Sequence, residues 1–443
     1  MRPTIRNIPF ARPSLGPDEE QAVLRVMRSG WLTTGSEAEA FEREFAECAG
    51  VEHAVALSSA TAGLHLGLEA LGVQEGDFVA MSPYTFAATA EVTRYLGAHP
   101  LFVDIDPETL NIDPRQLDAA LNSLDHTQRV RVVLPVHIGG VPCPMREIRQ
   151  VIDQPRRGAS QRTGAGAGTG AGAGTGAGAG TGGELATGDQ ATPISILEDA
   201  AHVSPAAPTL GDGQLGTMGD GQLGTMGDAG VFSFYANKPI TTGEGGMLCT
   251  RNAELAERVR LMRLHGIDRQ VWDRYRSVGA GWRYEVVEAG YKYNMPDLLA
   301  AIGRVQLRRT EELRSRRSEI AMYYDQALGD TGYLRLPAAN GNTSHHLYVL
   351  RIIPEHLKIT RDEFIAQLSE LGVGTSVHYI PLHIMPYYRR RYGVQAADFP
   401  EALRAFECCI SLPIYPDLTD EEREYVVQAV RSVGDTAYQG KGA

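Results

Sequence analysis

A single lysine follows an apolar run in the stretch GVFSFYANKPITTGEGG, which begins at Gly230. The pattern predicts a buried strand, with Ser233 and Lys238 on it or just after it. A lysine held among apolar groups has a lowered pKa and can act as an amine nucleophile toward a carbonyl. The small residues of TTGEGG leave room for a flat ligand. The alternative for a lone lysine is an ordinary surface position.

A turn of small hydroxylic residues joins a predicted strand to a predicted helix in LSSATAGLHLGLEAL, residues 57–71. Free backbone N–H groups near Ser59, Ala60 and Thr61 would face outward at the start of this helix. Such a helix N-terminus binds phosphate. The alternative is a simple helix cap without a ligand.

Two carboxylates end another predicted strand in ISILEDAAH, where Glu198 and Asp199 are followed by His202. In a doubly wound sheet the carboxyl ends of the strands line the ligand crevice, so one acid is expected to face it. A solvent-facing carboxylate and a packed structural histidine are the alternatives. An aromatic residue, Phe86, stands in SPYTFAAT. A phosphate cradle, a carboxylate, an amine nucleophile and an aromatic platform together predict a pyridoxal phosphate (PLP) site.

These residues need a scaffold, and the periodicity predicts one. PDEEQAVLRVMRSG and EAEAFEREFAECAG have helical apolar spacing, so two helices open the chain. From HAVALSS onward, short apolar strands alternate with helical stretches up to ISILEDAAH. This α/β pattern predicts a mostly parallel sheet with helices on both faces.

The pattern changes near residue 300, where we expect a smaller α+β domain over 301–443 to follow a large domain over 1–300. LLAAIGRVQLRRTEELRSRRSEIAMYYDQAL predicts one long helix. HHLYVLRII predicts a strand, RDEFIAQLSEL a helix, GTSVHYI a strand and DEEREYVVQAV a final helix. The adjacent Cys408 and Cys409 would point to opposite faces of a strand.

Two segments of low complexity interrupt the large domain. Residues 158–183 are almost entirely glycine, alanine and threonine and cannot repay their ordering entropy, so we expect a flexible surface loop remote from the chemistry. The octapeptide GDGQLGTM occupies 211–218 and again 219–226, as a local duplication within a turn. We expect it to bulge outward. The alternative is that it projects over the crevice, where it could alter substrate access or weaken cofactor binding.

The composition limits the partners of the protein. The formal net charge is −12, which argues against nucleic acid or an anionic membrane as a partner. The opening residues lack the apolar core of a signal peptide and no run is long enough to cross a membrane, so we expect a cytoplasmic protein. Five cysteines show neither a CxxC pair nor metal spacing, so we expect reduced thiols and no metal.

The ordered motifs resemble those of the DegT/DnrJ/EryC1/StrS family of sugar aminotransferases. The resemblance rests on SGWLTTG, SSATAGLHLGL, PYTFAATA, VDIDPETLNID, PVHIGG, EDAAH, FSFYANKPITTGEGG, GYKYNMPDLLAAIGRVQL, HLYVLRI, GTSVHYIPLH and SLPIYPDLTDEE, which cover nearly the whole chain. It implies a fold-type I PLP-dependent transferase. It further implies a homodimer that aminates a nucleotide-linked keto-sugar with nitrogen from glutamate or glutamine.

The same resemblance implies roles for individual residues. Lys238 matches the lysine that bonds to the cofactor and then carries a proton between substrate and cofactor, and Asp199 the acid that pairs with the pyridine nitrogen. The remaining matches are the histidine on the phenolic oxygen, the stacking aromatic, the phosphate binders and an asparagine that reaches the neighbouring subunit's phosphate: His202, Phe86, Ala60, Thr61, Ser233 and Asn294.

Other functions stay open. His378 and His383, in VHYIPLH, could line a substrate pocket or simply pack. A cyclitol aminotransferase of the same family is the main alternative activity, and a non-catalytic ligand-binding or regulatory relative is the alternative from another class. A dehydratase of the family is disfavoured, because those enzymes resemble this chain but have histidine in place of the lysine.

Overall fold

The computed structural model describes residues 7–125, 128–154, 193–205, 222–268, 284–338 and 343–440. The whole predicted Gly-Ala insertion (158–183) and its surroundings (155–192), and the first octapeptide copy (211–218), lie outside these ranges. The second copy is described from Gln222 onward.

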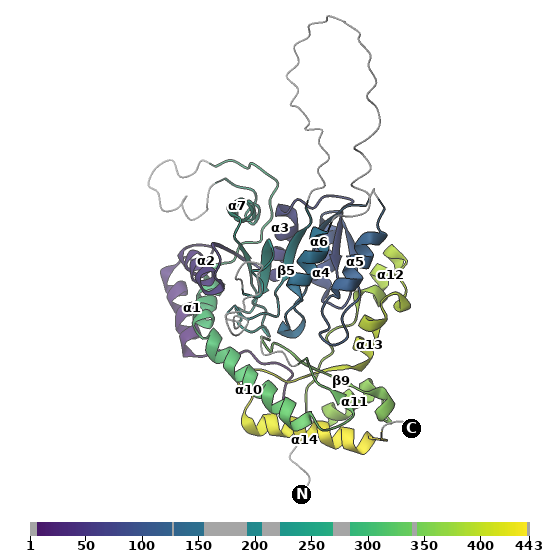
Figure 1. The fold of residues 1–443 in the computed structure, drawn as a ribbon. Coiled ribbons are helices and arrows are strands. Elements are labelled where there is room, and N and C mark those ends of the chain that lie inside the picture. The colour runs from purple at the N-terminus through teal and green to yellow at the C-terminus, as the bar shows by residue number, and fades with distance from the viewer. Residues whose placement is uncertain are drawn as a thin grey trace, which may run out of the picture.

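A seven-stranded sheet forms the centre of the molecule, in the order β1-β7-β6-β5-β4-β2-β3 (Figure 1). Strand β7 runs antiparallel to β1 and β6, and the other pairs are parallel. The mostly parallel sheet predicted from the alternating pattern is therefore confirmed. The strands are β1 His53–Leu57, β2 Phe78–Met81, β3 His99–Phe102, β4 Val130–Val133, β5 Ser195–Asp199, β6 Ala229–Ser233 and β7 Gly246–Thr250.

Helices cover both faces of this sheet. Leu197 of β5 belongs to a hydrophobic cluster with residues of α3 (Ala60–Ala70), α4 (Ala87–Tyr95) and α7 (Ala253–Met262). Its neighbour Ile196 belongs to a second cluster, with residues of α5 (Pro114–Ser123) and α6 (Met145–Asp153). Successive side chains of a strand point to opposite faces, so these helices form two separate layers.

Two helices open the chain as predicted, α1 (Pro17–Ser29) and α2 (Ser36–Ala49), and both pack on α9 (Asp297–Arg308). The buried Asp297 carboxylate accepts hydrogen bonds from the backbone N–H groups of Gly35, Glu37 and Ala38. It therefore caps α2 and attaches the segment before that helix to the start of α9.

The C-terminal part adds a smaller three-stranded antiparallel sheet in the order β10-β9-β8. Helices α10 and α14 lie along the side of the molecule away from the central sheet (Figure 1). The elements are α10 Thr310–Leu328, β8 Leu334–Arg335, β9 Tyr348–Ile352, α11 Arg361–Glu370, α12 Pro386–Tyr392, α13 Pro400–Cys408, β10 Cys409–Leu412 and α14 Asp420–Ala437, with 3-10 turns at Ile138–Gly140, Pro354–His356, Leu382–Ile384 and Ala396–Asp398.

Three local predictions were wrong. The long helix divides into α9 and α10 at Arg309 (φ −92°, ψ 0°), where the Thr310 hydroxyl donates to the Leu307 carbonyl at 2.7 Å. The segment 374–380 forms no strand; Ser376 forms an isolated bridge with Ser411, and the Gly374 N–H donates to the Ile8 carbonyl at 2.8 Å. Cys408 ends α13 and Cys409 begins β10, so the two thiols do not share a strand.

The division of the chain at residue 300 stays a prediction. Tyr388 of α12 and Ala402 of α13 pack in the same cluster as the strands of the central sheet, while Ile8 packs with the C-terminal elements. The backbone N–H groups of Glu401 and Ala402 also donate to Asp104, which follows β3. Packing therefore crosses the predicted boundary in both directions.

Candidate active site

Lys238 lies on the turn that follows β6. Its backbone N–H donates to the Tyr235 carbonyl at 3.0 Å, and its side chain is half-buried. Burial lowers the pKa of Lys238 to about 8, although the nearby Asp199 carboxylate acts in the opposite direction. The amine is thus partly neutral at neutral to mildly alkaline pH, as a nucleophile toward a carbonyl requires.

Asp199 ends β5 and is buried. One carboxylate oxygen accepts from the Thr89 hydroxyl at 2.9 Å, and the other from the Ala201 N–H at 3.1 Å. Burial raises the pKa of Asp199, whereas these two hydrogen bonds and the Lys238 charge lower it. A buried acid beside an amine can receive a cationic ring nitrogen.

The buried His202 has a defined tautomer. Its Nδ1 accepts from the Gly139 N–H at 3.1 Å, so in the neutral ring the proton is on Nε2. Nε2 lies 2.8 Å from the Tyr379 hydroxyl. Burial, reinforced by Lys238, lowers the pKa of His202 well below its ordinary value, so the ring is neutral and presents one N–H donor.

The predicted phosphate binders converge at the start of α3. Ser59 caps this helix by accepting from the Ala62 N–H at 3.1 Å, which leaves the N–H groups of Ala60 and Thr61 without partners inside the helix. Gly246 of β7 pairs with Ser233 on one side and Leu57 on the other. A Cβ at Gly246 would lie 2.5 Å from the Ala60 nitrogen, so only glycine allows this approach.

Phe86 is exposed and lies near Tyr379. It is the N-cap residue of α4, and 62% of its surface is accessible. Its ring centroid lies 6.3 Å from that of Tyr379, which in turn contacts His202. An exposed aromatic ring next to buried polar groups can act as a platform for a planar ligand.

Asn294 lies next to β1 of its own chain, where it forms a bridge with Leu57. Its side-chain amide donates to the Thr34 hydroxyl at 2.6 Å, and its carbonyl oxygen accepts from the Lys292 ammonium. Asn294 therefore lies at the same end of the sheet as the start of α3. That Asn294 contacts the cofactor phosphate of a partner subunit stays a prediction.

The two histidines of VHYIPLH have different surroundings. His378 is half-buried, its Nδ1 lies 2.8 Å from the Ser411 hydroxyl, and burial reinforced by Lys238 lowers its pKa to about 4. His383 is fully buried against Phe399, and its Nε2 contacts the Ala396 carbonyl at 3.3 Å. His378 thus belongs to the surroundings of Lys238, whereas His383 has the packing role that the sequence also allowed.

Several residues of this region are absent from the predicted set. Thr89 holds Asp199, and it follows Thr85 by four residues within YTFAAT. Gly139 orients His202 with φ of 64°, and the double glycine of PVHIGG was the available signal. Tyr379 adjoins His378 in the sequence, but no spacing rule connects it to His202, 177 residues earlier.

The residues present suit PLP. Unpaired N–H groups at a helix N-terminus fit its phosphate, Asp199 its ring nitrogen and Lys238 its carbonyl. The His202 Nε2–H, which here meets the Tyr379 hydroxyl, is the donor that fits its phenolic oxygen. Among the described residues, no group of three or more potential ligands could hold a metal ion. None of the helices in the described ranges is both long enough and apolar enough to cross a bilayer.

Known proteins are similar to this chain in sequence and in fold along nearly its whole length. The profile of the DegT/DnrJ/EryC1/StrS aminotransferase family matches residues 13–156 and 184–431. The spore coat polysaccharide biosynthesis protein SpsC of Bacillus subtilis is 40% identical over 96% of this chain and 97% of its own.

Solved structures give the same result. Spr1654 of Streptococcus pneumoniae in its PLP form is 28% identical, with a TM-score of 0.79 over 98% of this chain and 100% of that one. The aminotransferase TlmJ of Streptoalloteichus hindustanus is 31% identical, with a TM-score of 0.77 over 97% of this chain and 100% of that one. The chain therefore belongs to the DegT/DnrJ/EryC1/StrS aminotransferase family and is a PLP-dependent enzyme of the sugar aminotransferase type.

Proposed function

We propose that the protein transfers an amino group from glutamate or glutamine to a keto-sugar carried on a nucleotide. The amino sugar would serve synthesis of cell-surface polysaccharide, lipopolysaccharide or an antibiotic. The observation that carries the proposal is the position of Lys238 on the turn after β6, near enough to the buried Asp199 at the end of the neighbouring strand β5 for the two charges to interact. The polysaccharide role of SpsC, 40% identical, supports the substrate class.

We assign the roles of the residues from their surroundings. When bound, PLP supplies an electron sink that makes a neighbouring C–H bond acidic. Lys238 would bind its carbonyl and then, as a free amine, move the proton at the reacting carbon. Asp199 would keep the ring nitrogen protonated, and Thr89 orients this carboxylate. Ala60, Thr61 and Ser233 would hold the phosphate, and Phe86 would cover one face of the ring.

The proposal includes a homodimer with shared sites. Asn294 lies at the end of the sheet that carries the α3 N-terminus, a position from which a loop near a two-fold axis could reach the partner's phosphate. One interface would then complete two sites.

A substrate panel tests the activity. Nucleotide-linked keto-sugars and a keto-cyclitol would each be incubated with glutamate or glutamine, and the aminated product measured. Turnover of a nucleotide sugar, absent in Lys238→Ala, is the expected result. Turnover of the keto-cyclitol alone would mean that a cyclitol, and not a nucleotide-linked sugar, is the substrate. Failure of the protein to take up PLP or to exchange its amino group with any donor would refute the enzymatic proposal.

A further inference from the structure

Glu198 is a buried carboxylate that the assigned chemistry does not use. It precedes Asp199 on β5, so the two side chains point to opposite faces of the sheet. Glu198 is fully buried. A buried charge persists only where hydrogen bonds replace its water, so the surroundings of Glu198 must supply donors.

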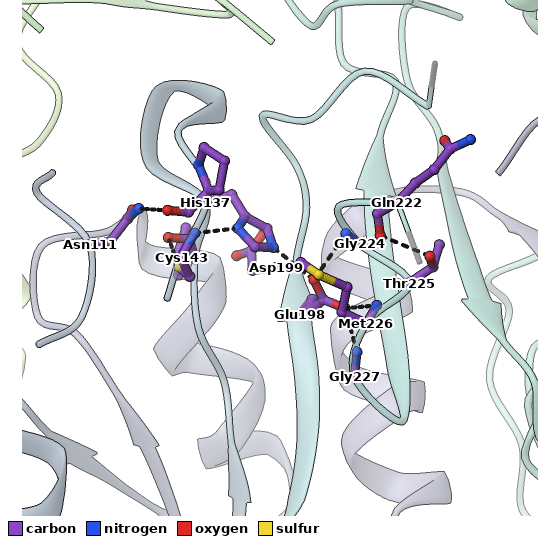
Figure 2. Close-up of polar contacts among 12 residues, drawn as sticks. Asn111, His137, Cys143, Glu198, Asp199, Gln222, Gly224, Thr225, Met226 and Gly227 are labelled. Carbon is purple, nitrogen blue, oxygen red and sulfur yellow. Dashed lines mark hydrogen bonds and ion pairs between the residues drawn. The ribbon is translucent and has the colours of Figure 1, made fainter. Parts of the chain in front are cut away.

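Four donors surround this carboxylate (Figure 2). Oε2 accepts from His137 Nε2 at 2.8 Å and from the Gly224 N–H at 2.9 Å. Oε1 accepts from the N–H groups of Met226 and Gly227, both at 2.6 Å. Each oxygen thus receives two hydrogen bonds, which is close to the capacity of an ionised carboxylate.

His137 donates to Glu198 through Nε2. Burial lowers the pKa of His137, but the neighbouring Cys143 and Glu198 raise it overall. The direction of the Cys143 N–H, at 3.0 Å, nevertheless makes Nδ1 an acceptor, so the Nε2 proton points to Glu198. The backbone N–H of His137 donates to the Asp199 carbonyl at 3.2 Å. One residue therefore connects Glu198 to the backbone of the acid that faces the active site.

The loop after His137 reaches the other side of the site. The next residue, Ile138, donates its N–H to the buried Asn111 side chain at 3.0 Å, and Gly139 then donates to His202 Nδ1. This N–H keeps the proton of His202 on Nε2. The position of Glu198 thus bears on the Asp199 backbone through His137, and on His202 through the loop that follows His137.

The turn that holds Glu198 belongs to the duplicated octapeptide. Gly224 and Met226 lie in the second copy, and Gly227 follows it. Gly224 has φ of 83°, and a Cβ there would lie 2.5 Å from Phe232 Cζ. The described part of the second copy therefore contacts Glu198, on the face of the sheet opposite to Asp199, whereas the sequence suggested an outward bulge or a projection over the crevice.

We propose that Glu198 is a positioning residue. Its carboxylate holds His137 and the 224–227 turn together and thereby fixes the Asp199 carboxylate and the Nε2–H of His202 toward the cofactor. The inference rests on the proposed function only in taking these two residues as cofactor contacts.

Glu198→Gln is the variant that tests it. The substitution keeps the side-chain volume but replaces one acceptor oxygen by an NH2 group, which would face N–H donors. The turn or His137 must then shift. We expect PLP to bind the variant apo-protein roughly tenfold or more weakly, a difference of about 1.4 kcal/mol.

A spectroscopic measurement separates positioning from general stability. If the His202 donor moves away from the phenolic oxygen, the anionic form of that oxygen loses stabilisation and its pKa rises. The pH midpoint of the bound cofactor's visible absorption should therefore lie higher in Glu198→Gln than in the wild type. Loss of stability alone does not move this midpoint.

Asp77→Asn is the matched control. Asp77 is also buried and accepts from the Gln74 N–H at 2.9 Å and from Arg129 Nε at 2.7 Å. It precedes β2, at the end of the parallel strands opposite to Asp199. We expect Asp77→Asn to lower the melting temperature, while the Kd for PLP and the absorption midpoint stay at wild-type values.

The outcomes are distinct. A folded Glu198→Gln protein with the wild-type Kd for PLP and the wild-type absorption midpoint overturns the inference. The inference is also overturned if Asp77→Asn changes these two quantities as much as Glu198→Gln does. If Glu198→Gln does not fold, His137→Phe removes one donor from Glu198 and is judged by the same two measurements. A wild-type protein that binds no PLP would instead refute the proposed function.

Discussion

The Thr89 hydroxyl lies 2.9 Å from the Asp199 carboxylate and comes from α4, 110 residues earlier in the chain. Thr85 lies 2.8 Å from the same hydroxyl, so Thr85 donates to Thr89 and Thr89 donates to Asp199. This relay helps to keep a buried acid ionised, because a hydrogen bond to the charged form lowers its pKa.

Thr89→Val should weaken cofactor binding. The loss of one donor removes about 0.5–1.5 kcal/mol of stabilisation from the ionised acid and raises its pKa, so the Kd for PLP should increase roughly two- to thirteenfold. Thr93→Val is the control on the same helix, since the buried Thr93 hydroxyl has no hydrogen-bond partner among the described residues. A titration of both apo-proteins with PLP measures the two Kd values. Equal Kd values for Thr89→Val and Thr93→Val would contradict the role of Thr89.

The capture of PLP by the apo-protein should depend on pH through Lys238. Only the neutral amine attacks a carbonyl, and burial lowers the pKa of Lys238 to about 8. The rate should therefore rise as the pH increases and level off above about pH 8, as measured by stopped-flow absorbance. Lys238→Ala should show no such phase and no turnover. A rate that still rises steeply above pH 9 would mean that the lysine keeps its ordinary pKa.

Removal of residues 160–181 should leave turnover nearly unchanged. The excised segment follows α6, which ends at Asp153, and precedes β5, which starts at Ser195. Ser195 is at the end of β5 opposite to Asp199, and the family match skips this part of the chain. The kcat of the deletion variant measures the effect. A large loss in a folded protein would show that the insertion acts on the site.

A chain with a single octapeptide should also keep its activity. Deletion of 211–218 and deletion of 219–226 produce the same sequence, because the two copies are identical. Either deletion leaves a complete turn to donate to Glu198. We expect wild-type kcat and Kd for PLP. A substantial loss of either would mean that both copies are needed.

Mixing two inactive variants tests the shared site. Lys238→Ala removes the amine, and Asn294→Asp would place a carboxylate against a phosphate, so each variant alone should be nearly inactive. If sites are shared, a heterodimer has one site with both defects and one with neither. Activity should then return to about a quarter of wild type at random equal mixing. Absence of recovery after verified subunit exchange would mean that each chain builds its own site, with Asn294 beside its own Leu57.

The architecture and the family could both be predicted from the sequence. Strand and helix periods are local properties, so the parallel sheet, the two opening helices and the strand that ends in Asp199 followed from short stretches of residues. Lys238 stood out for the same reason, since a charged residue directly after an apolar strand is visible without a fold. The motifs that resemble the family were also contiguous.

The tertiary structure alone decided which groups meet. The partners of His202 are Gly139 and Tyr379, and those of Glu198 come from the loop after β4 and the turn before β6. The same limit applies to the missing strand at 374–380, where Ser376 forms an isolated bridge with the distant Ser411. Hydrogen bonds form between groups that the whole fold brings within about 3 Å, and no pattern of apolar spacing encodes that distance.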